Sequence, residues 1–461
     1  MTGEIFKMLN SYKKLKRHSF SMPGHKNGKG FRGDLSKLDV TELADTDSLH
    51  NSDGACQRAS MSISKAYGAD MSIIMVNGST GGIFTMLAST LKRGDTVLVS
   101  RISHMSVMNA CITLGLKPIF FEHKFYAEFS LYGEADLEDF SKKLEENPVK
   151  AVLVVSPNYN GIVSDIKGMS EILAGKNIPL LVDEAHGAHF IASDDFPKNS
   201  IRLGADMSIT STHKTLNALN QSAILNVKSK IVDYDRVKTM SAFFQTSSPS
   251  YPIAASCESA VVEVGENSSK WLGTLKMCRE LKNVLKEKTL IKPLELSGDV
   301  FGLDPTRITL NLSAYDVEGH KISEILRNEY NIDIEMADNE NILLIATAAN
   351  DKKDFEVLKK ALLEISGKLK IRDIKKGSIK IPDIKCISDP SAAFYDEGEW
   401  VELEKSVGRV SKGTVLVYPP GVPIIVTGSE ITTEAVEFLN SCGGEIIGLR
   451  DGKIPVKKEG F

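Results

Sequence analysis

Short apolar runs alternate with helix-like segments through the first half of the chain. The runs predict strands buried on both faces, and they lie at residues 73–76, 96–100, 118–121, 151–156, 179–183, 207–210 and 222–227. Residues 83–91, between two of these runs, have the apolar spacing of a helix. This alternation predicts an α/β fold built on a doubly wound, mostly parallel sheet. Right-handed crossovers in such a sheet collect the carboxyl ends of the strands at one edge.

The second half of the chain has a different pattern, which predicts smaller α+β units. Expected helices lie at roughly 250–290, at 319–329 and at 352–369, and expected strands at 306–312, 341–346, 413–417 and 424–426. The apolar face of residues 1–20 predicts a short amphipathic helix. We therefore expect four parts: an N-terminal helix and arm (1–30), a large domain (31–292), a small α+β domain (293–370) and a C-terminal domain (371–461).

Composition narrows the class of protein. Of 461 residues, 42% are hydrophobic and 25% charged, as in ordinary globular proteins. The 56 Lys and Arg against 60 Asp and Glu give a net charge of −4, which argues against nucleic acid or an anionic membrane as the main partner. No run is long enough to span a bilayer, and the start lacks the apolar core of a secretory signal. Six scattered cysteines favour free thiols, so a cytoplasmic protein is expected.

Two neighbouring strands are each followed by a chemically informative side chain. Asp183 ends one apolar strand, and Lys214 follows the next, within Ser211-Thr212-His213-Lys214. An aspartate and a lysine at one edge of a parallel sheet suit pyridoxal phosphate. The lysine holds the aldehyde as a Schiff base, and the aspartate keeps the pyridine nitrogen protonated so that the ring accepts electrons.

Other polar residues fall at the same edge. The segment Asn77-Gly78-Ser79-Thr80-Gly81-Gly82 follows a strand and opens a helix, so its N–H groups and hydroxyls suit a phosphate, although its spacing is not that of a P-loop. Ser211 and His213 can reach the same phosphate. His104 follows another strand and can stack on the pyridine ring. Asp183, His186 and His189 have no further ligand at suitable spacing, so no metal is expected.

These segments resemble the Orn/Lys/Arg decarboxylase family, whose members have the aspartate-aminotransferase-like fold (fold type I) of pyridoxal-phosphate enzymes. The length is similar to that of the short form of the family. The matching segments run in order through most of the chain: Pro23-Gly24-His25-Lys26, residues 39–43, Leu49-His50, Asn77-Gly78-Ser79-Thr80, His104-Met105-Ser106, Asp183-Glu184-Ala185-His186-Gly187-Ala188-His189, Ser211-Thr212-His213-Lys214, residues 245–249 and Tyr418-Pro419-Pro420-Gly421.

The resemblance implies a role for each site residue. Lys214 and Asp183 hold the coenzyme at its two ends, His104 stacks on the ring, and His186 lies near the ring and the substrate carboxylate. Ser79, Thr80, Ser211 and His213 bind the phosphate. Thr246 reaches the phosphate of a neighbouring subunit, which implies a homodimer or a higher homo-oligomer with shared active sites.

The expected reaction is α-decarboxylation of lysine, arginine or ornithine, which gives a diamine or agmatine and carbon dioxide. Two other functions stay open. An aminotransferase or aldolase of the same fold would use an arginine clamp on the substrate carboxylate, for which Arg307 and Arg327 are available. A non-catalytic paralogue that binds the coenzyme would be expected to have lost Lys214 or Asp183, and this chain has both.

Overall fold

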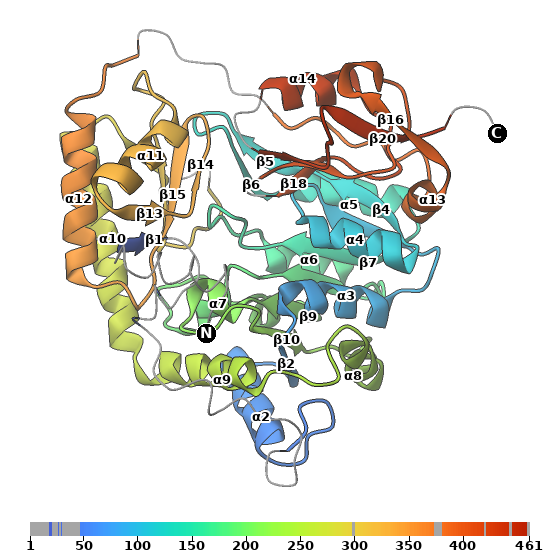
Figure 1. The fold of residues 1–461 in the computed structure, drawn as a ribbon. Coiled ribbons are helices and arrows are strands. Elements are labelled where there is room, and N and C mark those ends of the chain that lie inside the picture. The colour runs from blue at the N-terminus through green and yellow to red at the C-terminus, as the bar shows by residue number, and fades with distance from the viewer. Residues whose placement is uncertain are drawn as a thin grey trace, which may run out of the picture.

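The computed structural model describes residues 18–20, 26, 29, 47–296, 300–372, 380–418, 421–441 and 445–458. At its centre lies a seven-stranded sheet (Figure 1). In spatial order the strands are β2 (Met71–Met75), β10 (Ala223–Val227), β9 (Met207–Thr210), β8 (Leu180–Asp183), β7 (Val149–Val155), β3 (Thr96–Ser100) and β4 (Lys117–Phe121). Only β10 in this sheet runs antiparallel to its neighbours. The predicted α/β fold with a mostly parallel sheet is confirmed.

Helices cover both faces of this sheet, because successive strand residues point to opposite sides. Val97 and Val99 of β3 join one core, and Leu98 between them joins another. The first core receives α3 (Gly78–Thr90), α4 (Met105–Leu114) and α8 (Tyr234–Phe243). The second receives α5 (Leu137–Glu146) and α6 (Ile166–Leu173), and a third core beside it receives α2 (Ala55–Tyr67) and α9 (Tyr251–Glu266). A hairpin that the sequence pattern did not predict, β5 (His123–Tyr126) with β6 (Leu131–Ala135), lies beside β4.

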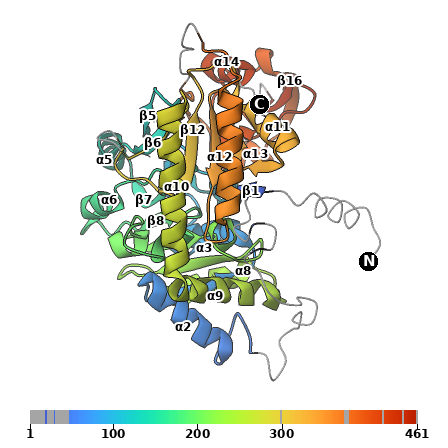
Figure 2. The ribbon, with the colours of Figure 1, turned by 90° about the vertical axis from the view of Figure 1, so that its left-hand side faces the viewer.

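A second body contains a four-stranded antiparallel sheet: β11 (Lys292–Pro293), β12 (Arg307–Asn311), β15 (Asn341–Ile345) and β14 (Met336–Ala337). Three helices pack on it: α10 (Ser268–Lys288), α11 (Gly319–Glu329) and α12 (Lys352–Ser366). Figure 2 shows α10 and α12 side by side along this body. The helical region expected at roughly 250–290 contains two helices, α9 and α10. Asn267 separates α9 from α10, which run in different directions (Figure 1).

The N-terminal helix expected at 1–20 is wrong in its last three residues, and the rest lies outside the described residues. His18–Phe20 form β1, which pairs in parallel with β13 (Ile332–Ile334). Phe20 is fully buried and meets Phe355 of α12 edge to face, with ring centroids 5.7 Å apart. A strand suits these residues because β13 supplies their hydrogen-bond partners and Phe20 reaches the core of the small body.

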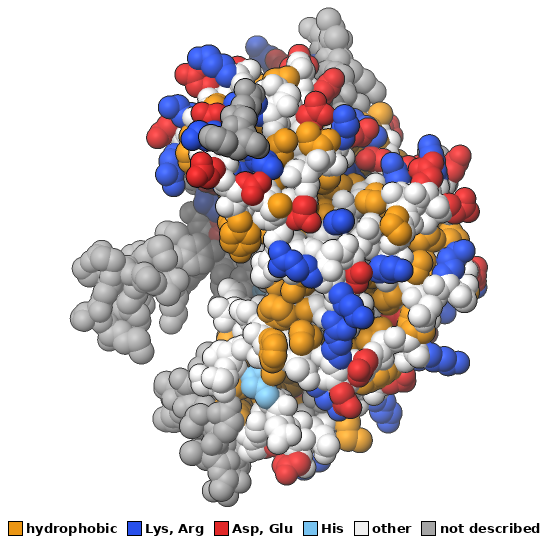
Figure 3. All heavy atoms as spheres, turned by 90° about the vertical axis from the view of Figure 1, so that its right-hand side faces the viewer, with side chains coloured by type: hydrophobic (Ala, Val, Ile, Leu, Met, Phe, Trp, Pro, Cys, Tyr) orange, Lys and Arg blue, Asp and Glu red, His pale blue; other side chains and the backbone are white. Residues whose placement is uncertain are grey.

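The third body contains two small sheets. β16 (Gly398–Glu402) pairs with β20 (Lys453–Lys457), and β17 (Val415–Tyr418) lies between β18 (Val422–Ile425) and β19 (Glu445–Ile447). Helices α13 (Pro390–Tyr395) and α14 (Thr433–Ser441) accompany them. On the face shown in Figure 3, Lys and Arg side chains are interspersed with Asp and Glu. Among the described residues, no helix combines the length and apolarity that a bilayer span requires.

Candidate active site

Asp183 and Lys214 reach the same edge of the large sheet from neighbouring strands. Asp183 is the last residue of β8, is 5% exposed, and its Oδ1 accepts a hydrogen bond from the Ala185 N–H at 3.1 Å. Lys214 lies in the short helix α7 (Thr212–Thr215), which follows the parallel neighbour β9. Burial lowers the pKa of Lys214, and the charge of Asp183 acts against that shift. The two groups therefore lie within Coulombic range of each other.

Two side-chain contacts connect Lys214, through His186, to Arg307 of the second body. The Lys214 Nζ lies 3.1 Å from His186 Nε2, and a terminal nitrogen of Arg307 lies 2.8 Å from His186 Nδ1. His186 is 6% exposed and Arg307 is fully buried. Burial, Lys214 and Arg307 all lower the pKa of His186, so its imidazole is neutral near pH 7.

Tyr159 lies beside His186, and Glu335 lies beside Tyr159. The Tyr159 ring meets His186 edge to face, with centroids 4.8 Å apart, and its hydroxyl donates a short hydrogen bond to Glu335. Burial and the Glu335 charge raise the pKa of Tyr159, so the phenol keeps its proton. The charge of Glu335 also raises the pKa of Lys214, although burial outweighs this effect.

The expected phosphate-binding residues meet at the start of α3. The hydroxyls of Ser79 and Ser211 lie 2.5 Å apart, which brings the first turn of α3 to the end of β9. Gly78 has a φ of 67°, a conformation that glycine adopts readily, and it turns the chain from β2 into the helix. His213 donates from Nδ1 to the Ser222 carbonyl at 2.9 Å, which leaves Nε2 as its second polar atom. Thr80 is exposed on the same turn.

His104 lies near Asp183 and Lys214, because both charges act on its pKa, which loss of hydration lowers. It is the N-cap of α4, and its Nδ1 accepts from the Ser106 N–H at 3.2 Å. That hydrogen bond fixes the ring plane at the edge of the site. Gly421 of the third body faces the ring so closely that a Cβ there would lie 3.7 Å from it.

Thr246 lies on an exposed loop apart from these contacts. Its hydroxyl is 3.3 Å from that of Ser248, and its carbonyl accepts from His50 Nε2 at 2.8 Å. The preceding Gln245 accepts from the Val76 N–H at 2.7 Å, so the loop is held at the end of β2. Within one chain, the structure does not bring the Thr246 hydroxyl to the Ser79–Ser211 pair.

Comparisons with known proteins identify the family. The Orn/Lys/Arg decarboxylase major domain matches residues 4–296, and the C-terminal domain of the same family matches residues 387–444. Over 452 residues, the chain is 32% identical to an arginine decarboxylase of Bacillus anthracis, covering 94% of this chain and 92% of the relative. The chain belongs to the Orn/Lys/Arg decarboxylase family. The predicted family and the decarboxylase class of enzyme are confirmed.

Solved structures show that the likeness extends to the fold of this chain. The constitutive lysine decarboxylase of E. coli matches with a TM-score of 0.79 at 20% identity, over 98% of this chain and 81% of that one. A structure named SPT with PLP matches with a TM-score of 0.57 at 15% identity, over 75% and 86% of the two chains. Parts of the matching sequence segments, residues 23–25, 39–43 and 419–420, lie outside the described part of the chain.

Sequence reasoning missed three members of the site of this Orn/Lys/Arg decarboxylase. Tyr159 follows β7 at the same sheet edge, so its position in the strand order was an available signal. Arg307 and Glu335 come from the second body, and no local pattern places that body over the large sheet. Arg307 was considered only as a carboxylate clamp. The other arginine considered, Arg327, is exposed and pairs with Asp333 at 3.1 Å.

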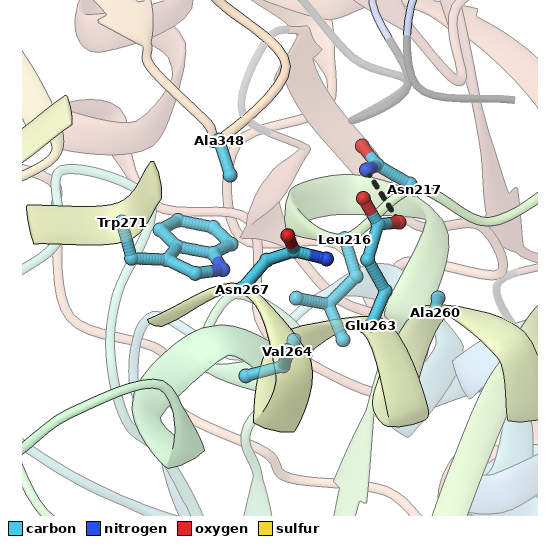
Figure 4. Close-up of a pocket in the computed structure, with 8 residues that line it drawn as sticks. All are labelled: Leu216, Asn217, Ala260, Glu263, Val264, Asn267, Trp271 and Ala348. Carbon is cyan, nitrogen blue, oxygen red and sulfur yellow. Dashed lines mark hydrogen bonds between the residues drawn. The ribbon is translucent and has the colours of Figure 1, made fainter. Parts of the chain in front are cut away.

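A second hollow in the decarboxylase lies between α9, α10 and the loop after Lys214 (Figure 4). Asn217 donates to Glu263 across it at 2.8 Å, and Trp271 and Ala348 line its other side. Its space is about that of one water molecule, so it offers no room for a substrate. Among the residues that the structure describes, no three His, Cys, Asp or Glu side chains form a metal-binding group.

Proposed function

We propose that the protein binds pyridoxal phosphate at Lys214 and removes the α-carboxyl group of a basic amino acid, with arginine as the first substrate to test. One observation carries the proposal: Lys214 and Asp183 lie within Coulombic range of each other at the carboxyl ends of two adjoining parallel strands. The arginine decarboxylase of B. anthracis supports arginine, and the family leaves lysine and ornithine as further substrates.

The side chains at this edge fit the coenzyme. The Asp183 carboxylate is buried, and a buried carboxylate is costly unless a positive group such as a pyridinium N–H meets it. The start of α3, with Ser79, Thr80, Ser211 and His213, supplies N–H and hydroxyl donors for a phosphate. His104 would lie against the ring. When bound, pyridoxal phosphate supplies an aldehyde that condenses with amines and a protonated ring that accepts electrons.

The protein residues would orient the substrate and move protons. The scissile carboxyl group must stand perpendicular to the coenzyme ring, and a site that buries this group without pairing it with a strong cation favours its loss. Asp183 would keep the proton on the ring nitrogen. Lys214, displaced by the substrate amine, would take up the proton that the substrate ammonium releases and could then return a proton to the Cα carbon. The closed environment of His186 and Tyr159 would keep water from this face.

Glu335 is the residue that we assign to the distal cation of the substrate. Two carboxylates, Asp183 and Glu335, raise the pKa of Lys214 and so lie near its amine. Because Asp183 would be occupied by the coenzyme ring, Glu335 would meet the guanidinium or ammonium at the far end of a basic side chain. Glu335→Gln should then raise KM about tenfold or more with a smaller change in kcat. Equal KM values for the variant and the wild type would exclude this role.

The decisive experiment identifies the lysine. Protein incubated with pyridoxal phosphate is reduced with borohydride, and the labelled peptide is found by mass spectrometry. The label should lie on Lys214, and Lys214→Ala should lose both the label and the yellow absorbance. The exposed Lys238 offers the control, and Lys238→Ala should retain both. A label on another lysine would overturn the proposal, and carbon dioxide release from a panel of amino acids then ranks the substrates.

We also propose that the protein is a homodimer in the cytoplasm. Thr246 lies on an exposed loop, apart from the Ser79–Ser211 pair of its own chain. This position suits a hydroxyl that completes the phosphate site of a second subunit.

A further inference from the structure

A buried arginine lies behind the lysine of the site, one side chain away. Arg307, the first residue of β12, reaches across from the small body and contacts His186 Nδ1 at 2.8 Å, while His186 Nε2 faces Lys214 Nζ at 3.1 Å. The guanidinium is also held from its far side by Asp304, whose Oδ2 lies 3.9 Å from the Arg307 Nε and 3.0 Å from His189 Nε2. All these groups are fully buried apart from His186 and Lys214.

Only one arrangement of protons satisfies both contacts of His186. An arginine has five N–H donors, no acceptor, and keeps its charge in proteins. Its contact with Nδ1 therefore requires that Nδ1 be an acceptor. A neutral imidazole has one donor and one acceptor, so Nε2 must carry the ring proton. An N–H at Nε2 then needs an acceptor, and an ammonium has none, whereas a neutral amine has a lone pair.

We infer that Arg307 is a positioning residue that fixes the proton of His186 on Nε2 and thereby holds Lys214 as a neutral amine. This inference rests on the proposed role of Lys214 in binding the coenzyme. An amine adds to an aldehyde carbon through its lone pair, and a protonated amine has no lone pair to give. Arg307 thus prepares the nucleophile without touching the coenzyme or the substrate.

Some charged groups around Lys214 raise its pKa and others lower it. Asp183 from β8 and Glu335 after β13 favour the ammonium form, and Arg307 from β12 disfavours it. His104 at the start of α4 also lies within range, since Lys214 lowers the pKa of His104. Burial is the largest influence and favours the neutral amine, while the two carboxylates oppose it. Arg307 adds to the effect of burial in two ways, through its charge and through the hydrogen bond that decides which nitrogen of His186 carries the proton.

Nitrogen NMR on the coenzyme-free wild type tests the proton assignment directly. Protein labelled with ¹⁵N-histidine is compared with a His186→Gln variant to assign the His186 signals. We expect Nδ1 to resonate as an unprotonated nitrogen and Nε2 as a protonated nitrogen near pH 7.5. A proton on Nδ1, or on both nitrogens, would overturn the inference. This measurement needs no Arg307 variant, so it stands even if such a variant does not fold.

Variants then connect the arginine to the lysine. The coenzyme-free proteins are treated with an amine-directed reagent across a range of pH, and mass spectrometry follows the Lys214 peptide. Arg307→Met should lower the modification rate of Lys214 at neutral pH about tenfold or more, because each unit of raised pKa costs a factor of ten in free amine. Arg307→Lys keeps a charged donor that cannot accept, and it should stay within about threefold of the wild type.

Arg327 provides the matched control. It is an exposed arginine of the same small body, paired with Asp333, and Arg327→Met should leave both the His186 signals and the Lys214 rate unchanged. An unchanged Lys214 rate in Arg307→Met would overturn the inference. If the nitrogen pattern is as expected but borohydride labels another lysine, the proposed function fails and the neutral amine stands. If borohydride labels Lys214 but the nitrogen pattern differs from the expected one, the proposed function stands and only the role of Arg307 is overturned.

Discussion

Asp183 illustrates how burial makes a single side chain informative. A carboxylate at the end of a buried strand loses most of its hydration, and in this chain it gains one backbone hydrogen bond, from Ala185. Its neighbour Lys214 has its pKa lowered by burial. In the proposed function, Asp183 would meet a cationic N–H of the ligand and Lys214 would meet its carbonyl carbon.

Replacing Asp183 by asparagine keeps the shape and removes the charge. The variant should still bind pyridoxal phosphate, because Lys214 and the start of α3 are unchanged. Turnover should fall about 10- to 100-fold, since a charge-assisted hydrogen bond contributes about 1.5–3 kcal/mol. Coenzyme absorbance and carbon dioxide release, measured on one preparation, separate these effects. Near-full activity would refute the role of the carboxylate.

The positions of some site residues could be predicted from the sequence, and those of others could not. Asp183, Lys214, Ser79 and Ser211 each follow a strand of the large sheet, and parallel strands end together, so their convergence could be predicted. Arg307 belongs to another body. Its place beside His186 depends on how two packed cores meet, and a pattern of apolar residues along one chain does not encode that geometry.

At the scale of elements, Glu184 ties β8 to the short helix η3 (Ser200–Leu203). Its Oε1 accepts from the Ser200 N–H at 2.7 Å and from the Ser200 hydroxyl at 2.9 Å. The side chain is 1% exposed, and burial raises its pKa to about 8 from 4.5. The carboxyl group is therefore protonated in the folded protein at neutral pH and acts as a neutral anchor next to Asp183.

This shift predicts a pH-dependent stability. Between about pH 4.5 and 8 the folded state holds a proton on Glu184 that the unfolded state has lost, so the free energy of unfolding falls as pH rises through that range. The slope from this group is about 1.4 kcal/mol per pH unit. Glu184→Gln is neutral at every pH and should lack it. Urea unfolding of both proteins at several pH values checks the difference, and parallel curves would contradict the assignment.

The positions of the strands were largely predictable from the sequence, whereas the break at Asn267 in the helical region 250–290 was not. The runs at 96–100 and 207–210 coincide with β3 and β9, because a strand buried on both faces leaves a continuous apolar signal. The region 250–290 keeps helical spacing on both sides of Asn267, yet α9 packs against α2 and α10 packs against α12. Two different partners require the turn, and tertiary packing rather than local preference sets it.

At the scale of the whole molecule, a buried polar contact joins the large and small bodies. His189 from the short helix η2 (Ala188–Ile191) lies 3.0 Å from Asp304, which precedes β12. His189 also stacks on Trp271 of α10, with centroids 5.2 Å apart. Interactions with His189 and Arg307 lower the pKa of Asp304, even though burial opposes that shift. The same carboxylate thus supports both the contact between the bodies and the position of Arg307.

Asp304→Asn should destabilise the protein strongly, because it leaves the buried Arg307 guanidinium without its carboxylate partner. We expect a loss of about 3–5 kcal/mol in the free energy of unfolding, measured by denaturant titration. Glu171 forms an exposed pair with Lys167, so Glu171→Gln should change stability by no more than about 1 kcal/mol. Similar losses in the two variants would show that the buried pair has no special importance.

Mixed oligomers test whether neighbouring subunits share active sites. Thr246→Ala and Lys214→Ala should each lose activity as a homo-oligomer. Mixing them after dissociation should restore part of the activity, because one site in a mixed dimer then combines Lys214 from one chain with Thr246 from the other. Activity no higher than the sum of the separate variants would mean that each chain builds its site alone.

The pairing of β1 with β13 also constrains how the chain matures on the ribosome. His18 lies opposite Ile332 in that pair, so the earlier strand must wait for its partner until the residues between them have been translated. At ordinary elongation rates this delay is on the order of tens of seconds. The large sheet is complete in sequence by Val227 and can assemble during the wait, whereas β1 docks only after β13 has been made.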